Sequence, residues 1–119
     1  MYSETFLDHF KNPRHVGELP PPAVTVEISN PACGDILRLS GRFGDDGRLA
    51  EVGYKIRGCT ASIASGSALT ECMLGKTRDE LAGITAATVE SAAGGLIPES
   101  KHAAALCVDA VKAFLKAAK

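Results

Sequence analysis

The sequence has few aromatic residues, almost no surplus charge and no long apolar run. It contains no Trp and only six aromatic residues in 119, but 18 Ala and 12 Gly. A core here must therefore rely on close packing of small side chains. A net charge of −1 argues against a nucleic-acid binder, which needs a basic surplus to contact phosphates. With 45% hydrophobic and 23% charged residues, whole-chain disorder, collagen and coiled coil are excluded, and we expect a single domain over 1–119.

Membrane and secretion signals are also missing from the sequence. No stretch approaches the roughly 20 consecutive apolar residues of a membrane span. The first residues, MYSETFLDHFKNPRHVG, lack the basic, apolar and small-residue layout of a secretion signal. We therefore expect a cytoplasmic protein that does not bind membranes. Because thiols stay reduced in that compartment, the four cysteines favour metal binding or reactive-thiol chemistry over disulfides.

Strand patterns come first along the chain and helical patterns later, apart from a short N-terminal helix. This order predicts an α+β fold, with a small three-stranded antiparallel sheet covered by about four to five helices. Alternating apolar and polar residues predict strands at Val24–Ser29, Ile36–Phe43 and Leu49–Arg57. The segment GDDG at 44–47 favours a hairpin turn between the last two strands.

Helix caps and apolar spacing predict the helical elements. They are a helix over 2–11 with Ser3 as its cap, one over 60–74 ended by Gly75, a short one with a capping box of Thr77 and Glu80, a piece within 83–95, and a last helix from about Ser100 to Ala118. In the last helix the expected buried residues are Ala104, Val108, Val111 and Leu115, with Cys107 and Phe114 at the flanks.

The predicted hairpin brings chemically active residues together at its open end. Cys33 and Cys59 each lie thirteen residues from Asp46 in the turn, so a symmetric register places them side by side on strands roughly 5 Å apart. Asp35 is two residues from Cys33 and faces the same way in an extended chain. Cys59 also precedes a helix, whose free N–H groups favour a thiolate. Two thiolates and a carboxylate at one place indicate a metal or reactive-thiol site; the alternative is two unrelated core cysteines.

A transition-metal site takes about four ligands, so a further ligand is expected nearby. His102, at the start of the last predicted helix, is the best candidate, although a lone His at a helix start is more often exposed. Cys107 lies on nearly the same helical face as position 103, and it is either a ligand or a buried core thiol. Cys72 lies about 20 Å along a helix from Cys59, too far to share the site, and is interpreted as a core residue.

Other polar residues have simpler explanations. His9 and His15, beside Lys11 and Arg14, are interpreted as a solvated basic patch. The Ser-rich stretch at 60–70 lacks the His and Asp partners of a catalytic triad, and small residues for helix packing explain it. No catalytic residue is predicted.

Four ordered segments of the chain resemble the IscU-type iron–sulfur cluster assembly scaffolds, a family that includes the N-terminal domain of NifU. YSETFLDHFKNPRHVG resembles the N-terminal helix and NPRNVG signature, and NPACGD resembles the first ligand loop, ACGD. RGCTASIASGSALTE resembles the GCGxAIASSS segment, and KHAAALCVDAVKAFL resembles the C-terminal HCSxLAxDAIKAAI helix. The resemblance covers nearly the whole length and implies the IscU/NifU-N-like fold.

The resemblance implies a scaffold rather than an enzyme. On such a scaffold a [2Fe–2S] cluster is built from iron and desulfurase-supplied sulfide and is then passed to apo-proteins. The implied metal ligands are Cys33, Asp35, Cys59 and His102, with Cys33 and Cys59 holding the cluster and zinc as an alternative metal. The implied partners are a cysteine desulfurase and recipient apo-proteins, and we expect a monomer or a weak homo-oligomer.

The chain departs from the family pattern at two places. The family's third cysteine follows the histidine, and here that position is Ala103; Cys107 replaces it only with a shift of roughly 6 Å along the helix axis. Without Cys107 the site suits one zinc or iron ion better than a cluster. Two alternative functions therefore remain open besides the scaffold function. One is a zinc-dependent acceptor of persulfide sulfur, and the other is a diverged family member with a structural metal only. LIPES at 96–100 replaces the LPPVK segment read by a dedicated chaperone, so that contact is not predicted.

Overall fold

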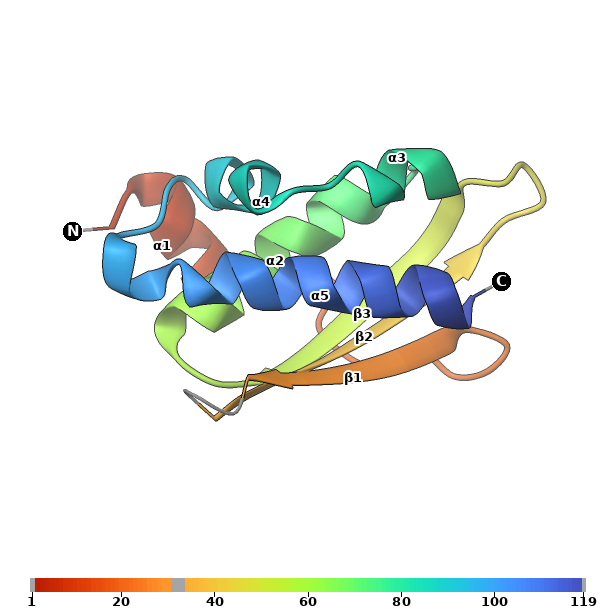
Figure 1. Cartoon of the computed structure of the whole chain (residues 1–119), viewed down its shortest axis with the longest axis horizontal. Coiled ribbons are helices and arrows are strands. Elements are labelled where there is room, and N and C mark those ends of the chain that lie inside the picture. Colours follow the sequence, from red (N-terminus) through yellow and green to blue (C-terminus); the bar gives the residue numbers. More distant parts are fainter. Residues whose placement is uncertain (1, 31–33, 119) are drawn as a thin grey trace.

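An antiparallel sheet with strand order β1–β2–β3 forms one layer of the molecule, as Figure 1 shows. The computed structural model describes residues 2–30 and 34–118. The strands are β1 (Val24–Asn30), β2 (Asp35–Phe43) and β3 (Leu49–Arg57). Each agrees with its predicted bounds to within one residue, because alternation and turn chemistry are local signals.

Helices form the second layer and cover one face of the sheet (Figure 1). The described part of the chain contains α1 (Glu4–Lys11), α2 (Thr60–Met73), α3 (Arg78–Ala82), α4 (Ala86–Ala92), the 3-10 turn η1 (Pro98–Ser100) and α5 (His102–Ala117). The predicted caps are confirmed: Ser3 Oγ accepts the Phe6 N–H at 3.1 Å, and Thr77 and Glu80 form the reciprocal capping box. None of the described helices combines the length and apolar character needed to span a bilayer.

A β-bulge changes the register of the β2–β3 hairpin. Phe43 pairs with Leu49, as a turn centred on position 46 predicts, but the pairing shifts by one residue between Arg42 and Phe43. The shift continues to the open end, where Ile36 pairs with Arg57. The predicted symmetric register is therefore wrong by one residue, because a bulge places an extra residue on one strand.

The core between the two layers depends on close approach at glycines, as the low aromatic content predicts. A Cβ on Gly66 of α2 would lie 2.6 Å from the Tyr54 ring, and a Cβ on Gly41 of β2 would lie 2.7 Å from the Phe114 ring. The largest fully buried side chains include Tyr54, Phe6, Phe114, Leu37, Leu39, Leu69 and Met73. Glycine thus lets the few large rings lie directly against neighbouring backbone.

The buried face of α5 is rotated relative to the prediction. Buried residues on this helix are Ala103, Ala104, Leu106, Cys107, Ala110, Val111 and Phe114. Val108 and Leu115, which were expected to be buried, are half-buried. Because Gly41 admits the Phe114 ring onto the sheet, the side of the helix that carries Phe114 and Cys107 faces the core.

Candidate metal centre

Three elements that are distant in the sequence meet at one end of the molecule: the open end of the β2–β3 hairpin, the start of α2 and the start of α5 (Figure 1). Asp35 is the first residue of β2, Cys59 is the N-cap of α2, and His102 is the first residue of α5. Among the described residues, these three form a group whose potential ligand atoms all lie within 4.8 Å of one another.

The three donor atoms form a nearly equilateral triangle. Cys59 Sγ lies 3.7 Å from Asp35 Oδ2 and 3.7 Å from His102 Nε2. His102 Nε2 lies 3.5 Å from Asp35 Oδ2. For metal–ligand bonds of about 2.0–2.3 Å, the edges of a tetrahedron are about 3.3–3.8 Å long. The triangle therefore has the dimensions of one face of a tetrahedral metal site, and its thiolate, carboxylate and imidazole donors suit zinc or iron.

Burial differs sharply among the three donors. The Asp35 side chain is 4% exposed and the His102 side chain is 31% exposed, whereas Cys59 is exposed. The carboxylate thus forms the floor of the group, and the thiol and the imidazole lie at the surface. A metal bound here would be reachable from solvent, so the arrangement favours exchange over permanent enclosure.

Gly58 makes room for the buried carboxylate. A Cβ at this position would lie 2.6 Å from both Cγ and Oδ1 of Asp35, which is closer than real Cβ contacts allow. The one-residue shift of the hairpin explains this proximity, since continuing the pairing of Ile36 with Arg57 by one step sets Gly58 opposite Asp35. The absence of a side chain at Gly58, directly before Cys59, therefore leaves space for the Asp35 carboxylate.

Ser62, which the sequence analysis did not single out, belongs to the same group. It is 1% exposed, its hydroxyl donates a hydrogen bond to Asp35 Oδ2, and its Oγ lies 3.4 Å from Cys59 Sγ. Its spacing of three residues from Cys59 on a helix is the signal that could have revealed it. A hydroxyl in this place orients the carboxylate in the way that outer-shell partners orient metal ligands.

The remaining predicted ligands lie away from this group or outside the described residues. Cys33 lies outside the described residues. Cys107 is 1% exposed in the main core and is absent from the group of donors; burial raises its pKa to about 12. A thiol that stays protonated is a poor metal ligand. The expected family position Ala103 is also fully buried and packs with Phe6, Ala61 and Ala64.

Of the two N-terminal histidines, only His15 agrees with the predicted solvated patch. His9 is buried, with Nδ1 2.7 Å from Ser67 Oγ and Nε2 3.3 Å from Glu71 Oε1. Burial, followed by the charge of Arg14, lowers the pKa of His9. The interpretation is therefore wrong for His9, because α1 packs against α2 and encloses its side chain. His15 is exposed as expected.

Fold and site together define a small α+β domain with a group of potential metal ligands at one end. The family model described as "NifU-like N terminal domain" matches residues 1–118. The chain therefore belongs to the NifU-like N-terminal domain family, and the resemblance seen in the sequence is confirmed.

Relatives of this chain differ in how much of their own length the match covers. The chain is 36% identical over 118 residues to the iron–sulfur cluster assembly scaffold protein IscU of Azotobacter vinelandii, covering 97% of this chain and 91% of that protein. It is 41% identical to the bifunctional protein NifU/MnmA of Rubrobacter xylanophilus, covering 92% of this chain but only 23% of that protein. A solved structure described as a putative SUF-system scaffold from Fervidobacterium islandicum has a TM-score of 0.77 at 21% identity, covering 96% of each chain. This likeness supports the predicted fold class.

Proposed function

We propose that this protein is an iron–sulfur cluster assembly scaffold, which binds iron and a labile [2Fe–2S] cluster as cargo and passes the cluster to apo-proteins. The observation that carries the proposal is the triangle of Asp35, Cys59 and His102 donors at an open end of the domain. Family membership and a relative named as a scaffold protein support the same role. The role is one of holding and transfer rather than catalysis.

The proposed ligand set is Cys33, Asp35, Cys59 and His102. Thiolates bind iron strongly, whereas carboxylate and imidazole ligands hold it less firmly. A mixed set suits cargo that must leave again. The exposure of Cys59 supports this role, because an acceptor's thiolate needs a direct approach to displace a ligand. Cys107 is left as a core residue in this proposal.

The proposed partners follow from the chemistry of the cargo. A cysteine desulfurase would supply sulfur, and apo-proteins with free thiolates would receive the cluster. The described cysteines, Cys59, Cys72 and Cys107, are free thiols, which supports work in a reducing compartment such as the cytoplasm.

A second candidate is a zinc-dependent acceptor of persulfide sulfur. Here the acceptor thiolate would attack the outer sulfur of a desulfurase persulfide, and the desulfurase cysteine would leave as a thiolate. The observation that favours this candidate is Ala103 in place of the family cysteine, which leaves a mixed N, O and S donor set of the kind zinc accepts.

Anaerobic reconstitution separates the two candidates. The full chain would be incubated with ferrous iron, a cysteine desulfurase, cysteine and a thiol reductant, and iron and acid-labile sulfide would be counted per chain. Visible charge-transfer bands with matched iron and sulfide are expected for the scaffold. A colourless protein that retains stoichiometric zinc would overturn the scaffold proposal. Cys59→Ser should abolish the bands, while Cys72→Ser, which alters a half-buried thiol outside the donor group, is the matched control.

A further inference from the structure

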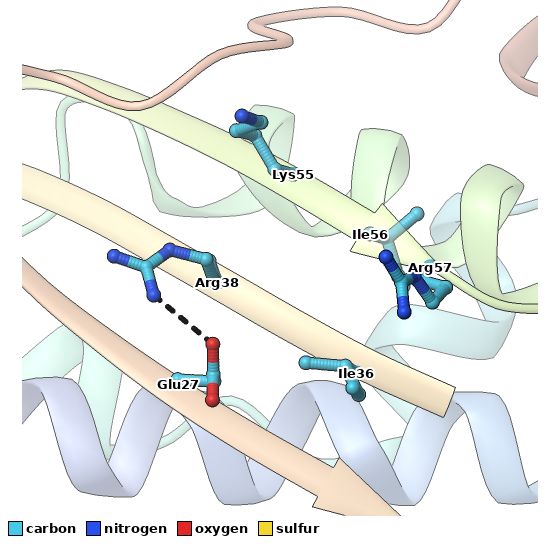
Figure 2. Close-up of a pocket in the computed structure, with 6 residues that line it drawn as sticks. All are labelled: Glu27, Ile36, Arg38, Lys55, Ile56 and Arg57. Atoms are coloured by element: carbon cyan, nitrogen blue, oxygen red, sulfur yellow. Dashed lines mark hydrogen bonds and ion pairs between the residues drawn. The ribbon is translucent and has the colours of Figure 1, made fainter. Parts of the chain in front are cut away.

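The sheet face turned away from the helices carries a groove that the metal centre does not use. Figure 2 shows side chains from all three strands lining it, with the helices behind the sheet. Its volume is about 360 Å³, and its lining residues are Glu27, Ile36, Arg38, Lys55, Ile56 and Arg57. The groove lies at the same end of the hairpin as the candidate metal centre, because Ile36 directly follows Asp35 and Arg57 lies two residues before Cys59. Asp35 and Ile36 are consecutive residues of β2, so their side chains point to opposite faces of the sheet.

Two cations in this groove form no direct ion pair within the described residues. The pKa of the nearby Glu18 is lowered by its hydrogen bond from Arg38 and also by the charge of Lys55, one of these two cations. Arg38 is neutralised by Glu18 at 2.8 Å and by Glu27 at 3.0 Å. Lys55 and Arg57 are exposed, and within residues 2–30 and 34–118 neither forms an ion pair. On a chain with a net charge of −1, they give the groove a local positive potential.

The spacing of the cations matches an extended peptide. Lys55 and Arg57 are alternate residues of β3, so they point to the same face about 7 Å apart. Carboxylates at alternate positions of an extended peptide have the same spacing. Ile36, paired with Arg57 across the strands, adds an apolar surface beside the Arg57 side chain. A partner segment that fits this groove is therefore extended. It carries acidic side chains at alternate positions, with an apolar side chain beside them.

We propose that this groove docks an extended acidic segment of the protein that exchanges iron or sulfur with the metal centre. Such docking would hold the partner's reacting group beside Cys59, which lies on the exposed side of the donor triangle. The identity of the partner's cargo rests on the proposed scaffold function. The docking itself needs only Lys55, Arg57 and Ile36, so it occurs without metal.

A nucleic acid is a poorer fit to the same groove. Its lining residues include no aromatic ring on which a base could stack. Glu27 lines the groove and Glu18 reaches into it through Arg38, and both would repel a continuous polyanion. An acidic peptide reduces this repulsion where it places an uncharged residue next to these carboxylates, whereas every nucleotide carries a phosphate.

Nuclear magnetic resonance titration of the metal-free chain tests the proposal. The probe is a synthetic octapeptide that alternates Glu with Val; the comparison probes are an octapeptide alternating Lys with Val and an oligothymidylate of similar length. We expect saturable shifts of the amides at 36–38 and 55–57 with the Glu peptide, and affinity that falls severalfold between about 50 and about 300 mM salt. No saturable shifts there, equal binding of the Lys peptide, or tighter binding of the oligothymidylate would each overturn the proposal.

A charge-reversal pair locates the interaction. The double variant Lys55→Glu/Arg57→Glu should lower the affinity for the Glu peptide about tenfold or more, given the size of exposed ion-pair energies. Lys112→Glu is the matched control, since Lys112 is exposed on α5, which packs on the other face of the sheet. Equal losses in both variants would contradict a local site. Cluster reconstitution of the double variant is run separately, so a failure of the scaffold function remains distinguishable from a failure of docking.

Discussion

Ser62 donates a hydrogen bond to Asp35 Oδ2, and that same oxygen lies 3.5 Å from His102 Nε2 and 3.7 Å from Cys59 Sγ. One hydroxyl on the first turn of α2 therefore sets the position of the oxygen that completes the donor triangle. Because Asp35 is buried, water cannot readily replace this hydrogen bond. The geometry of the candidate metal centre therefore involves a residue that is not itself expected to bind a metal.

Replacing Ser62 by Ala should weaken metal binding without unfolding the chain. Loss of an outer-shell partner typically costs about 10–100-fold in metal affinity, and competition with a chromophoric chelator for zinc or cobalt measures it. Ser65→Ala is the matched control, because Ser65 Oγ is buried and has no hydrogen-bond partner among the described residues. Unchanged affinity in Ser62→Ala would show that the hydroxyl does not orient the carboxylate.

Adding a methyl group at Gly58 should displace the Asp35 carboxylate. The new Cβ would lie 2.6 Å from Asp35 Cγ, so Gly58→Ala should destabilise the fold by about 1–3 kcal/mol and also reduce metal affinity. Urea unfolding of the metal-free protein and chelator competition measure the two effects. Gly83→Ala should be nearly neutral, since the nearest atom to its added Cβ is 3.5 Å away. Similar losses in the two variants would argue against a specific clash.

The thiols should differ sharply in reactivity. Cys59 is exposed, whereas Cys107 is buried, so an aromatic disulfide reagent should modify Cys59 in the native protein and reach Cys107 only on unfolding. Cys107→Ser should keep the metal stoichiometry but lower stability by about 1–3 kcal/mol, because it buries a hydroxyl in the core. Loss of metal from a folded Cys107→Ser protein would instead make this thiol a ligand.

Stability should fall as the pH drops below the ordinary pKa of histidine. Burial and Arg14 lower the pKa of His9 below its ordinary value of 6.5, so the unfolded chain binds a proton more readily than the folded one. His9 therefore favours the folded state above about pH 6.5, and this contribution is lost as the pH falls through the lowered pKa.

Urea midpoints of the metal-free protein between about pH 7.5 and about pH 5 test this dependence. His9→Gln should flatten the profile, whereas His15→Gln, which removes an exposed histidine, should leave it in place. An equally steep profile in His9→Gln would assign the effect to other groups.

The local elements could be predicted from the sequence, and so could the proximity of two residues of the candidate donor group to one end of the hairpin. Alternation, turn residues and caps depend on near neighbours in the chain, so the strand bounds and the Ser3 and Thr77 caps agree with the structure. Asp35 and Cys59 followed from the hairpin, because its turn sets which ends meet. The position of His102 at a helix start makes it only a candidate ligand. The resemblance to the scaffold family is what predicts it as a ligand.

Tertiary packing decided the rest. The one-residue bulge, which brings Gly58 opposite Asp35, arises from how β2 and β3 pair along their whole length. Packing of α5 against the sheet places Cys107 in the core. Packing of α1 against α2 buries His9. These outcomes depend on which surfaces meet across the fold, and residue spacing along one strand or helix does not determine that. The sequence alone determined the elements and named the candidate donors Asp35 and Cys59. The packing of the two layers determined which side chains lie together at the candidate site, because it sets which surfaces of the elements meet.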